Sequence, residues 1–327
     1  MELIRAEEVM ASHPEHERLA HDPAYAFGSA YVADHFCPIY EASVPLIDCG
    51  FMHADAVYDV VSVSRGAFFR LEGHQARFAR ACDAIRVRNP FSREREAEIL
   101  HELVARAGLR DAYVWWTVTR GQPPMGRSEM VNAANFDNRF YAFAVPFVFL
   151  ADDEQRTRGI DLIVSRDRIR IPPRAVDPTA KNFCWLDMQM ALFEAGERGA
   201  EWAVLTDEAG YLAEAAGANI FAVIDGTVVS PDSGCLEGLT RRSVVDLCSE
   251  LGLPAELRRV HADEFRAAQE AFMTTTAGSI MPVRSVDGIP IGGRNGPGEI
   301  SVRLHNLYWE KRWGGWHATP VRYELAV

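Results

Sequence analysis

Residues 159–198 read GIDLIVSRDRIRIPPRAVDPTAKNFCWLDMQMALFEAGER and set the plan of the second half of the chain. The apolar run at 159–165 predicts a strand, the arginine- and proline-rich segment at 166–178 predicts a loop, and the segment at about 182–198 predicts a helix. Lys181 lies between this loop and this helix. The stretch therefore places a lysine at the boundary between irregular and helical structure.

Lys181 is unusual because only two of the 34 basic residues are lysines, the other being Lys311. Arginine can carry a solvated positive charge equally well, but it stays protonated in proteins. A lysine amine can lose its proton when it is desolvated and can then attack a carbonyl to form a Schiff base. Lys181 is therefore a candidate nucleophile, and the alternative is an ordinary surface lysine, as we expect for Lys311.

Outward from this stretch, the chain predicts two halves joined by a polar linker at 151–156. We expect a small N-terminal domain at 1–150 with a β-β-α-α-β-β order, and a large C-terminal domain at 157–327. The expected helices lie at 71–85, 92–107, 240–251, 262–268 and 299–313. The expected strands beyond 159–165 lie at 26–31, 56–64, 113–120, 141–150, 202–206, 217–224, 257–260 and 271–274.

Composition excludes several classes of protein. The net charge of −12 and the lack of any basic run argue against nucleic acid and anionic membrane surfaces as partners. The six cysteines show no CxxC spacing, which argues against a metal site or a disulfide framework and favours a reducing compartment. The N-terminal 19 residues lack an apolar core, and the longest apolar run, 140–151, is too short to span a bilayer. We therefore expect a cytoplasmic protein.

Two further motifs could act with the lysine. Glu214 precedes Ala215-Ala216-Gly217-Ala218-Asn219, so a carboxylate is flanked by small residues that leave room for a flat ligand; the alternative is a solvated loop glutamate. Gly238-Leu239-Thr240 runs into a predicted helix, whose first amides can bind a phosphate.

Hydroxyls at 274–276 and Arg77 on a predicted helix offer additional phosphate donors, although each motif alone can be a simple cap or ion pair. An amine, a carboxylate and several phosphate donors together are the set that pyridoxal phosphate requires.

The chain resembles the class IV (branched-chain aminotransferase-like, fold type IV) pyridoxal phosphate enzymes over nearly its whole length. The blocks that carry the resemblance are Phe51 to Val60, Phe69-Arg70-Leu71 with His74-Gln75-Ala76-Arg77, Arg170 to Pro173 with Lys181-Asn182, Glu214 through Phe221, Gly238 to Arg241, and Thr275 to Gly278. The resemblance implies an α+β, two-domain fold, with a small α/β domain and a larger, β-barrel-like domain with helices.

The resemblance also implies roles for single residues. Lys181 would form the Schiff base and move the substrate proton, and Glu214 would pair with the pyridinium nitrogen. The phosphate and the rest of the cofactor would be bound by Arg77, Gly217, Asn219, Leu239, Thr240, Thr275 and Thr276. The substrate pocket would be lined by His53, Tyr58, Val60, Tyr113, Trp115, Arg127, Trp185, Thr275 and Ala277. No metal site is expected.

Two departures from the family pattern bear on the substrate. Branched-chain aminotransferases typically carry Tyr-x-Arg where this chain has Tyr113-Val114-Trp115, and D-amino acid aminotransferases typically carry Pro-Arg-x-His after Val-Thr-Arg-Gly, where this chain lacks the histidine. His53, Tyr58, Val60 and Trp185 are similar to residues of the family's (R)-selective amine transaminases. Arg127 resembles a mobile arginine that pairs with the carboxylate of a keto acid.

The resemblance therefore implies a homodimeric, cytoplasmic transaminase, with active sites near the dimer interface, that moves an amino group from an (R)-configured amine to a keto acid such as pyruvate. Alternatives within the family are a D-amino acid or branched-chain aminotransferase, or an enzyme like aminodeoxychorismate lyase. A relative that only binds a metabolite is a further alternative, and the retention of Lys181 and Glu214 argues against it.

Overall fold

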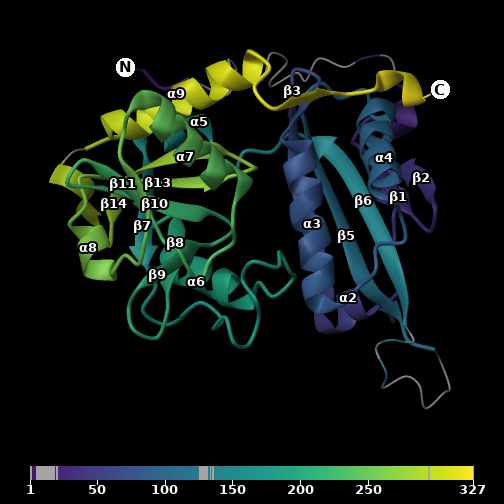
Figure 1. Ribbon diagram of the computed structural model, residues 1–327, viewed down its shortest axis with the longest axis horizontal. Helices are drawn as coiled ribbons and strands as arrows, with labels where there is room; N and C mark the ends of the chain where they lie inside the picture. The colour runs from purple at the N-terminus through teal and green to yellow at the C-terminus, as the bar shows by residue number, and fades with distance from the viewer. Residues whose placement is uncertain are drawn as a thin grey trace. The chain divides into compact units, whose positions relative to one another are not determined.

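A computed structural model describes residues 2–4, 19, 21–124, 132, 134, 136–293 and 295–326 (Figure 1). The chain divides into two compact units. Unit 1 comprises Met1–Glu8, Phe149–Thr179 and Cys184–Gly314, and unit 2 comprises Val9–Val148, Ala180–Phe183 and Gly315–Val327. The short segment that carries Lys181 therefore groups with the N-terminal half of the chain.

Unit 2 is built on an antiparallel sheet whose strand order is β16-β4-β3-β5-β6-β1-β2 among the described residues. The strands are β1 (Ser29–Val32), β2 (His35–Pro38), β3 (Ala56–Ser64), β4 (Ala67–Phe69), β5 (Ala112–Gln122), β6 (Asp137–Pro146) and β16 (Ala318–Pro320). Successive side chains of a strand point to opposite sides, so the sheet has two faces. One face is covered by helices, and the other carries Tyr58 and Val60.

Helices α3 (Leu71–Ile85) and α4 (Arg93–Arg106) cover the first face, and the short α2 (Cys49–His53) precedes β3 (Figure 1). Val57, Val61 and Val63 of β3 pack in one core with side chains of both long helices, and Trp116 of β5 is fully buried there. Ser92 caps α4, because its hydroxyl accepts a hydrogen bond from the Arg95 amide. Both helices match the predicted ranges to within a residue.

Unit 1 is built on a mixed sheet of order β12-β11-β10-β13-β14-β7-β8-β9, with β15 paired to β14, among the residues described. Its strands are β7 (Ile160–Val164), β8 (Trp202–Thr206), β9 (Leu212–Ala215), β10 (Asn219–Ile224), β11 (Thr227–Ser230), β12 (Ala255–Leu257), β13 (Glu270–Thr275), β14 (Ser279–Val286) and β15 (Ile289–Pro290). Its helices are α5 (Asp153–Arg158), α6 (Leu186–Glu197), α7 (Leu239–Leu251), α8 (Ala262–Arg266) and α9 (Glu299–Trp313).

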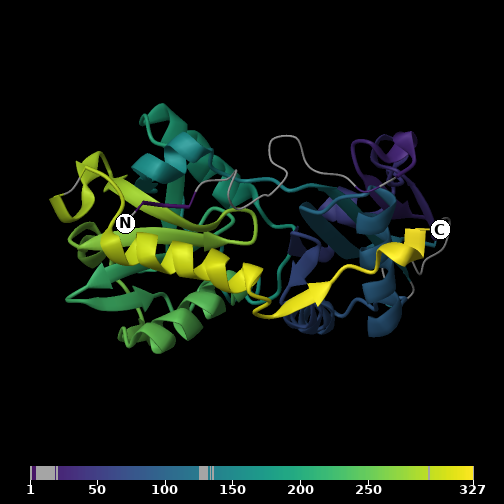
Figure 2. The same cartoon turned by 90° about the horizontal axis from the view of Figure 1, so that it is seen from above.

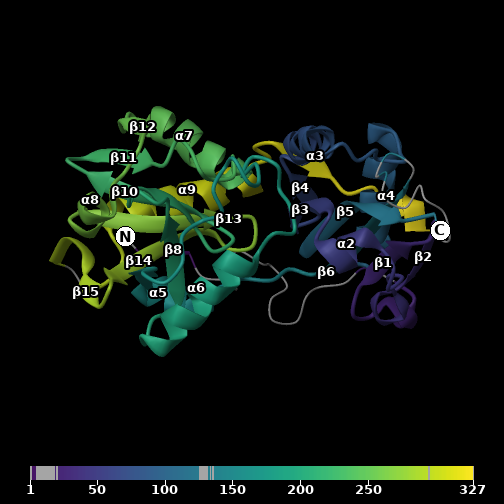
Figure 3. The same ribbon diagram turned by 90° about the horizontal axis from the view of Figure 1, so that it is seen from below.

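The helices of unit 1 lie against this sheet. Figure 2 shows α9 running along unit 1, where it contacts β13 and β14, and Figure 3 shows α6 beside β8. The helices predicted at 240–251 and 299–313 are confirmed as α7 and α9. Within the described ranges, no helix combines the length and the apolar character needed to cross a membrane.

One predicted boundary was wrong in a way that matters for the site. The helix expected from about 182 begins only at Leu186. Residues 181–182 make a tertiary contact instead, because Asn182 forms a bridge with Val57 and the Lys181 carbonyl accepts a hydrogen bond from the Tyr58 amide at 2.9 Å. Pairing with the edge of β3 therefore replaces the first turn of the predicted helix.

Glu96 in unit 2 gives a prediction about stability and pH. Burial raises the pKa of this carboxyl to about 7, although hydrogen bonds from Gln75 and Asn89 act in the opposite direction. Because the folded-state pKa lies above the ordinary value of 4.5, this group favours the folded state below that value and loses this contribution as the pH rises through about 7. Glu96→Gln removes the ionisation.

We expect Glu96→Gln to be more stable than the parent at pH 8 by about 1–3 kcal/mol, and to lose most of this advantage at pH 5. Thermal unfolding at both pH values measures the difference. Glu98→Gln is the matched control, since Glu98 lies on the same helix in an exposed ion pair with Arg95. An advantage that is the same at both pH values would contradict the assignment.

Candidate active site

Lys181 lies beside an aromatic ring of unit 2. Its backbone follows the edge of β3, and its Nζ lies 4.4 Å from the centroid of the Tyr58 ring. Val60 is the next residue of β3 on the same face, and it is buried like Tyr58. The predicted residues Lys181, Tyr58 and Val60 are therefore brought together by the pairing of residues 181–182 with β3.

A cluster of aromatic side chains continues this face of the sheet. Phe183 packs edge-on against Tyr58 with centroids 5.6 Å apart, and Trp115 lies 5.8 Å from Tyr58 and 5.9 Å from Phe183. Trp115 also stacks on Phe143 at 5.2 Å, as Tyr113 does at 6.4 Å. We call Tyr58, Tyr113, Trp115, Phe143 and Phe183 the aromatic cluster. Phe143 and Phe183 were not predicted from the sequence, and the closeness of Phe183 to Lys181 along the chain was the available signal.

Arg77 of α3 is bound by a buried carboxylate of β3. Its Nε and Nη2 donate to the two carboxylate oxygens of Asp59 at 2.8 and 2.7 Å, and the His74 ring lies 2.8 Å from the same carboxylate. Burial alone would raise the pKa of Asp59, but Arg77 and His74 hold it well below its usual range. Asp59 points toward α3, whereas its neighbour Tyr58 points to the opposite face.

Glu214 of β9 is the second buried carboxylate. Its Oε1 accepts from Arg170 Nε at 2.9 Å and its Oε2 accepts from the Leu236 amide at 3.1 Å. Arg170 also donates to Asp187 in the first turn of α6 at 2.7 Å. Burial would lower the pKa of Arg170, but Glu214 and Asp187 raise it overall, so the guanidinium stays charged. No single role was predicted from the sequence for Arg170 or Asp187.

A hairpin turn connects Glu214 of β9 to Asn219 of β10. Ala215 and Ala218 form a bridge, so Glu214 and Asn219 flank the turn. The Asn219 amide donates to the Leu236 carbonyl at 2.7 Å. Gly238 follows, and a Cβ at this position would come within 2.1 Å of Asn219 Oδ1. Gly238 is the N-cap of α7 and provides no side chain to satisfy the first amides of Leu239 and Thr240.

The threonine run at the end of β13 lies beside this turn. Asn219 and Thr274 are direct partners across β10 and β13, so their side chains lie on the same face. The Thr274 hydroxyl is buried and has no hydrogen-bond partner among the residues that the structure describes. Thr275 and Thr276 follow it, and the Thr275 hydroxyl accepts a weak hydrogen bond of 3.4 Å from the Ala277 amide.

The other predicted residues are Trp185, Gly217, His53 and Arg127. Trp185 is 36% exposed, and its ring packs so closely on Gly217 that a Cβ there would approach it within 2.6 Å. Gly217 also has a φ of +71°, which disfavours other residues. His53 is exposed at the end of α2. Arg127 lies outside the described residues.

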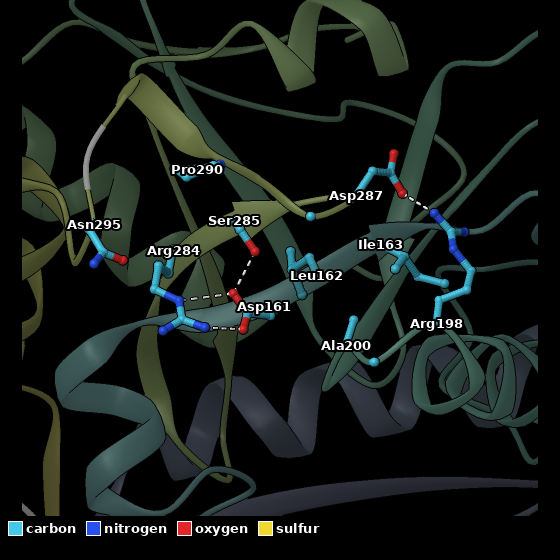
Figure 4. Close-up of a pocket in the computed structure, with 12 residues that line it drawn as sticks. Asp161, Leu162, Ile163, Arg198, Ala200, Arg284, Ser285, Asp287, Pro290 and Asn295 are labelled. Carbon is cyan, nitrogen blue, oxygen red and sulfur yellow. Dashed lines mark hydrogen bonds and ion pairs between the residues drawn. The ribbon is translucent and has the colours of Figure 1, made fainter.

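A cavity of about 400 Å³ in unit 1 contains none of the predicted site residues (Figure 4). Its charged side chains pair with one another, Arg284 with Asp161 and Arg198 with Asp287. The cavity is lined by Asp161, Leu162, Ile163, Arg198, Gly199, Ala200, Arg284, Ser285, Asp287, Gly288, Pro290 and Asn295. These ion pairs join β7, β14 and the end of α6, so they have a structural role.

Comparisons with known proteins identify the family. Residues 56–286 match the family model described as amino-transferase class IV. The branched-chain-amino-acid aminotransferase of Pseudomonas aeruginosa is 31% identical over 249 residues, which are 75% of this chain and 78% of that protein. A putative branched-chain-amino-acid aminotransferase of Methanocaldococcus jannaschii is 28% identical over 87% of this chain and 97% of its own length.

Solved structures agree with this result. The branched-chain amino acid aminotransferase of T.th. with pyridoxamine 5'-phosphate superposes with a TM-score of 0.82 at 30% identity, covering 90% of this chain and 99% of that one. The pyridoxal phosphate form of the enzyme from Thermobaculum terrenum superposes with a TM-score of 0.79 at 26% identity, covering 91% and 99% of the two chains. This chain therefore belongs to the class IV aminotransferases, with their α+β, two-domain fold type IV, and it is a pyridoxal phosphate-dependent aminotransferase.

The described residues fit this cofactor. Glu214 is a buried carboxylate of the kind that keeps a ring nitrogen protonated. The uncapped first turn of α7 offers backbone amides and the positive end of a helix, which suit a phosphate. The Thr274 hydroxyl, opposite Asn219 across β10 and β13, has no hydrogen-bond partner among the described residues and so leaves polar capacity on that face. The carboxylate and the helix start are linked through the Leu236 peptide.

Proposed function

We propose that this aminotransferase moves an amino group from an (R)-configured primary amine without a carboxylate to a keto acid such as pyruvate. The observation that carries the proposal is the aromatic cluster beside Lys181. At the position where branched-chain aminotransferases typically have the arginine of Tyr-x-Arg, Trp115 lies between Tyr58 and Phe143. An indole among aromatic rings favours an apolar substituent and offers no cationic partner for a carboxylate.

Arg120, in Val118-Thr119-Arg120-Gly121, does not take the place of the missing carboxylate-binding arginine. Its Nε and Nη2 donate to Asp55 at 2.9 Å each, and its guanidinium also donates to the carbonyls of Ile85 and Arg86. These contacts fix the end of α3 to β5. Since Arg120 has carboxylate and carbonyl partners in the fold, we assign the binding of the keto acid carboxylate to Arg127.

Tyr113 supports the apolar character of this face. Burial raises the pKa of its phenol well above the usual range, and Tyr58 and Asp59 raise it further, so the phenol stays neutral. The (R) configuration follows from the similarity of His53, Tyr58, Val60 and Trp185 to the corresponding residues of (R)-selective amine transaminases.

The proposed roles in catalysis follow from the contacts of each residue. When bound, pyridoxal phosphate supplies an electron sink that stabilises negative charge at the substrate carbon. Lys181 binds the cofactor covalently through Nζ and moves the proton at that carbon. Glu214, oriented by Arg170 and the Leu236 amide, holds the proton on the ring nitrogen.

The remaining proposed contacts hold the cofactor and the substrate. Leu239, Thr240, Thr276 and Arg77 bind the phosphate, and Thr275 and Gly217 complete the cofactor site, with Asn219 beside it. Ala277 and Thr275 line the substrate side. Asp59 keeps the Arg77 guanidinium fixed.

A branched-chain amino acid aminotransferase is the second candidate, because the relatives reported above carry that name. It requires a carboxylate-binding group to take over from the arginine that Trp115 replaces. A substrate screen separates the two candidates. The holoenzyme is mixed with (R)- or (S)-1-phenylethylamine, D-alanine or L-leucine, and the loss of the visible absorbance of the bound cofactor is followed in a stopped-flow instrument.

We expect (R)-1-phenylethylamine to react fastest. The (S) enantiomer should react at least about 10²-fold more slowly, because one face of the pocket must accept the larger substituent. If L-leucine reacts fastest and 2-oxoglutarate is the best acceptor, the branched-chain alternative is correct. If D-alanine reacts fastest and (R)-1-phenylethylamine does not react, the enzyme is a D-amino acid aminotransferase.

We further propose a cytoplasmic homodimer. The support is an apolar stripe on α6, in which Leu186, Met190 and Phe193 are 73%, 36% and 58% exposed at helical spacing. None of the cysteines in the described part of the chain forms a disulfide, which suits a reducing compartment. Light scattering coupled to size-exclusion chromatography tests the dimer, and a monomeric mass would contradict it.

A further inference from the structure

The Asn219 amide has its nitrogen hydrogen-bonded within the protein and its oxygen packed against a glycine. Its Nδ2 donates to the Leu236 carbonyl at 2.7 Å, and its Oδ1 lies against Gly238 so closely that any Cβ at 238 would collide with it. The residue itself is only 5% exposed. These contacts leave Asn219 poorly placed to be a ligand of the cofactor and well placed to act on residues 236–238.

The backbone of Leu236 is the junction on which Asn219 acts. Its carbonyl accepts from Asn219 and also from the Gly238 amide at 2.9 Å, and its amide donates to Glu214 Oε2 at 3.1 Å. The amide and the carbonyl of Leu236 belong to two successive planar peptide groups joined at its Cα, so holding the carbonyl group in place leaves only the two backbone torsions of Leu236 to orient the amide. The Asn219 contact therefore helps to aim an N–H group at the Glu214 carboxylate.

The same side chain sets the start of α7. Gly238 is the N-cap of that helix, and the amides of Leu239 and Thr240 follow it directly. Contact with Asn219 Oδ1 fixes how closely Gly238 approaches β10. Glu214 and Asn219 flank the turn closed by Ala215 and Ala218, so one hairpin carries both the carboxylate and the side chain that holds the helix start.

We propose that Asn219 is a positioning residue that couples the Glu214 carboxylate to the first turn of α7 through the backbone of Leu236. This inference rests on the proposed roles of Glu214 at the ring nitrogen and of the Leu239 and Thr240 amides at the phosphate. It replaces a direct contact between Asn219 and the cofactor. It predicts that one substitution at Asn219 disturbs both the contact to the ring nitrogen and the contacts to the phosphate.

Asn219→Asp tests the proposal through its pH dependence. A protonated aspartic acid can donate a hydrogen bond to the Leu236 carbonyl in place of the amide, whereas an aspartate cannot donate and repels both this carbonyl and Glu214. Because burial and the Glu214 carboxylate raise the pKa of a carboxyl at this position, we expect the Kd for pyridoxal phosphate, relative to the parent at the same pH, to rise by about 10- to 100-fold between pH 6 and pH 8.5. Asn219→Ala should weaken binding by a ratio that does not change with pH.

Two readouts are measured on purified protein: the Kd for pyridoxal phosphate by equilibrium dialysis, and the visible absorption of the bound cofactor against pH. Asn306→Asp is the matched control. Asn306 is 7% exposed in the same unit and also donates to a backbone carbonyl, that of Glu2 at 2.7 Å. It should lower the melting temperature without changing either readout.

The outcomes separate this inference from the proposed function. If Glu214→Gln alters the visible absorption but the Asn219 variants match the parent in both readouts, the positioning role is wrong and the role of Glu214 stands. An equal loss of affinity at every pH in Asn219→Asp and Asn219→Ala also overturns it, because general destabilisation would then explain both. If Glu214→Gln changes nothing, the proposed role of Glu214 fails and the inference fails with it.

Discussion

Lys181→Ala is expected to lose covalent attachment of pyridoxal phosphate and to lower kcat by about 10³- to 10⁴-fold. The Lys181 Nζ is the proposed point of attachment and the proposed carrier of the substrate proton, so one substitution removes both contributions. Reduction with borohydride followed by mass spectrometry measures the attachment. The parent chain should gain the mass of one reduced cofactor, and the variant should gain none.

The chain contains only two lysines, so there is only one alternative lysine to which the cofactor could attach. Lys311 is the only other lysine, and it is paired with Glu250 near the end of α9. Lys311→Ala should therefore keep both the mass label and the parent kcat. A label that persists in Lys181→Ala, or a kcat close to that of the parent, would show that Lys181 is not the attachment site. Partial recovery of the rate by added methylamine would support its role in proton transfer.

Periodicity in the sequence predicted the elements that are stabilised locally. The helices expected at 71–85 and 92–107 are α3 and α4, because caps such as Ser92 and amphipathic faces act over a few residues. The predicted cofactor residues Glu214 and Asn219 flank one turn, as their closeness in sequence suggests.

Contacts between distant segments were not predictable in the same way. The helix after Lys181 begins at Leu186 because residues 181–182 pair with β3, more than a hundred positions away in the chain. Strand β9 was missed because Leu-Ala-Glu-Ala contains no β-branched residue and is held in the sheet by its neighbours.

The pairing of Arg170 with Glu214 is a further tertiary contact. The two residues are 44 positions apart, and Arg170 is one of several arginines in its loop. Only the folded structure identifies the one whose guanidinium reaches both Glu214 and Asp187. The resemblance to a family supplied the block that contains Arg170, but spacing alone gave no reason to select it.

Glu214→Gln is expected to lower kcat by about 10²- to 10³-fold while changing the Kd for pyridoxal phosphate much less. The carboxylate holds a proton on the ring nitrogen, and a neutral amide favours that protonated state far less. The phosphate contacts assigned to α7 and Thr276 are left in place. Single-turnover measurements with the best amine give the rate of proton removal, and equilibrium dialysis gives the Kd.

The substitution also disturbs the protein around residue 214, and a control must separate the two effects. The Glu214 oxygens accept from Arg170 Nε and from the Leu236 amide, and a glutamine can accept with only one of its two ends. Asp187→Asn disturbs the same arginine from its other side, where Asp187 accepts from Arg170 Nη1, but it leaves the Glu214 charge unchanged. We expect it to slow proton removal by less than about tenfold. If Asp187→Asn slows the step as much as Glu214→Gln does, the loss comes from the Arg170 network, and the charge of Glu214 at the ring nitrogen is not what drives the reaction.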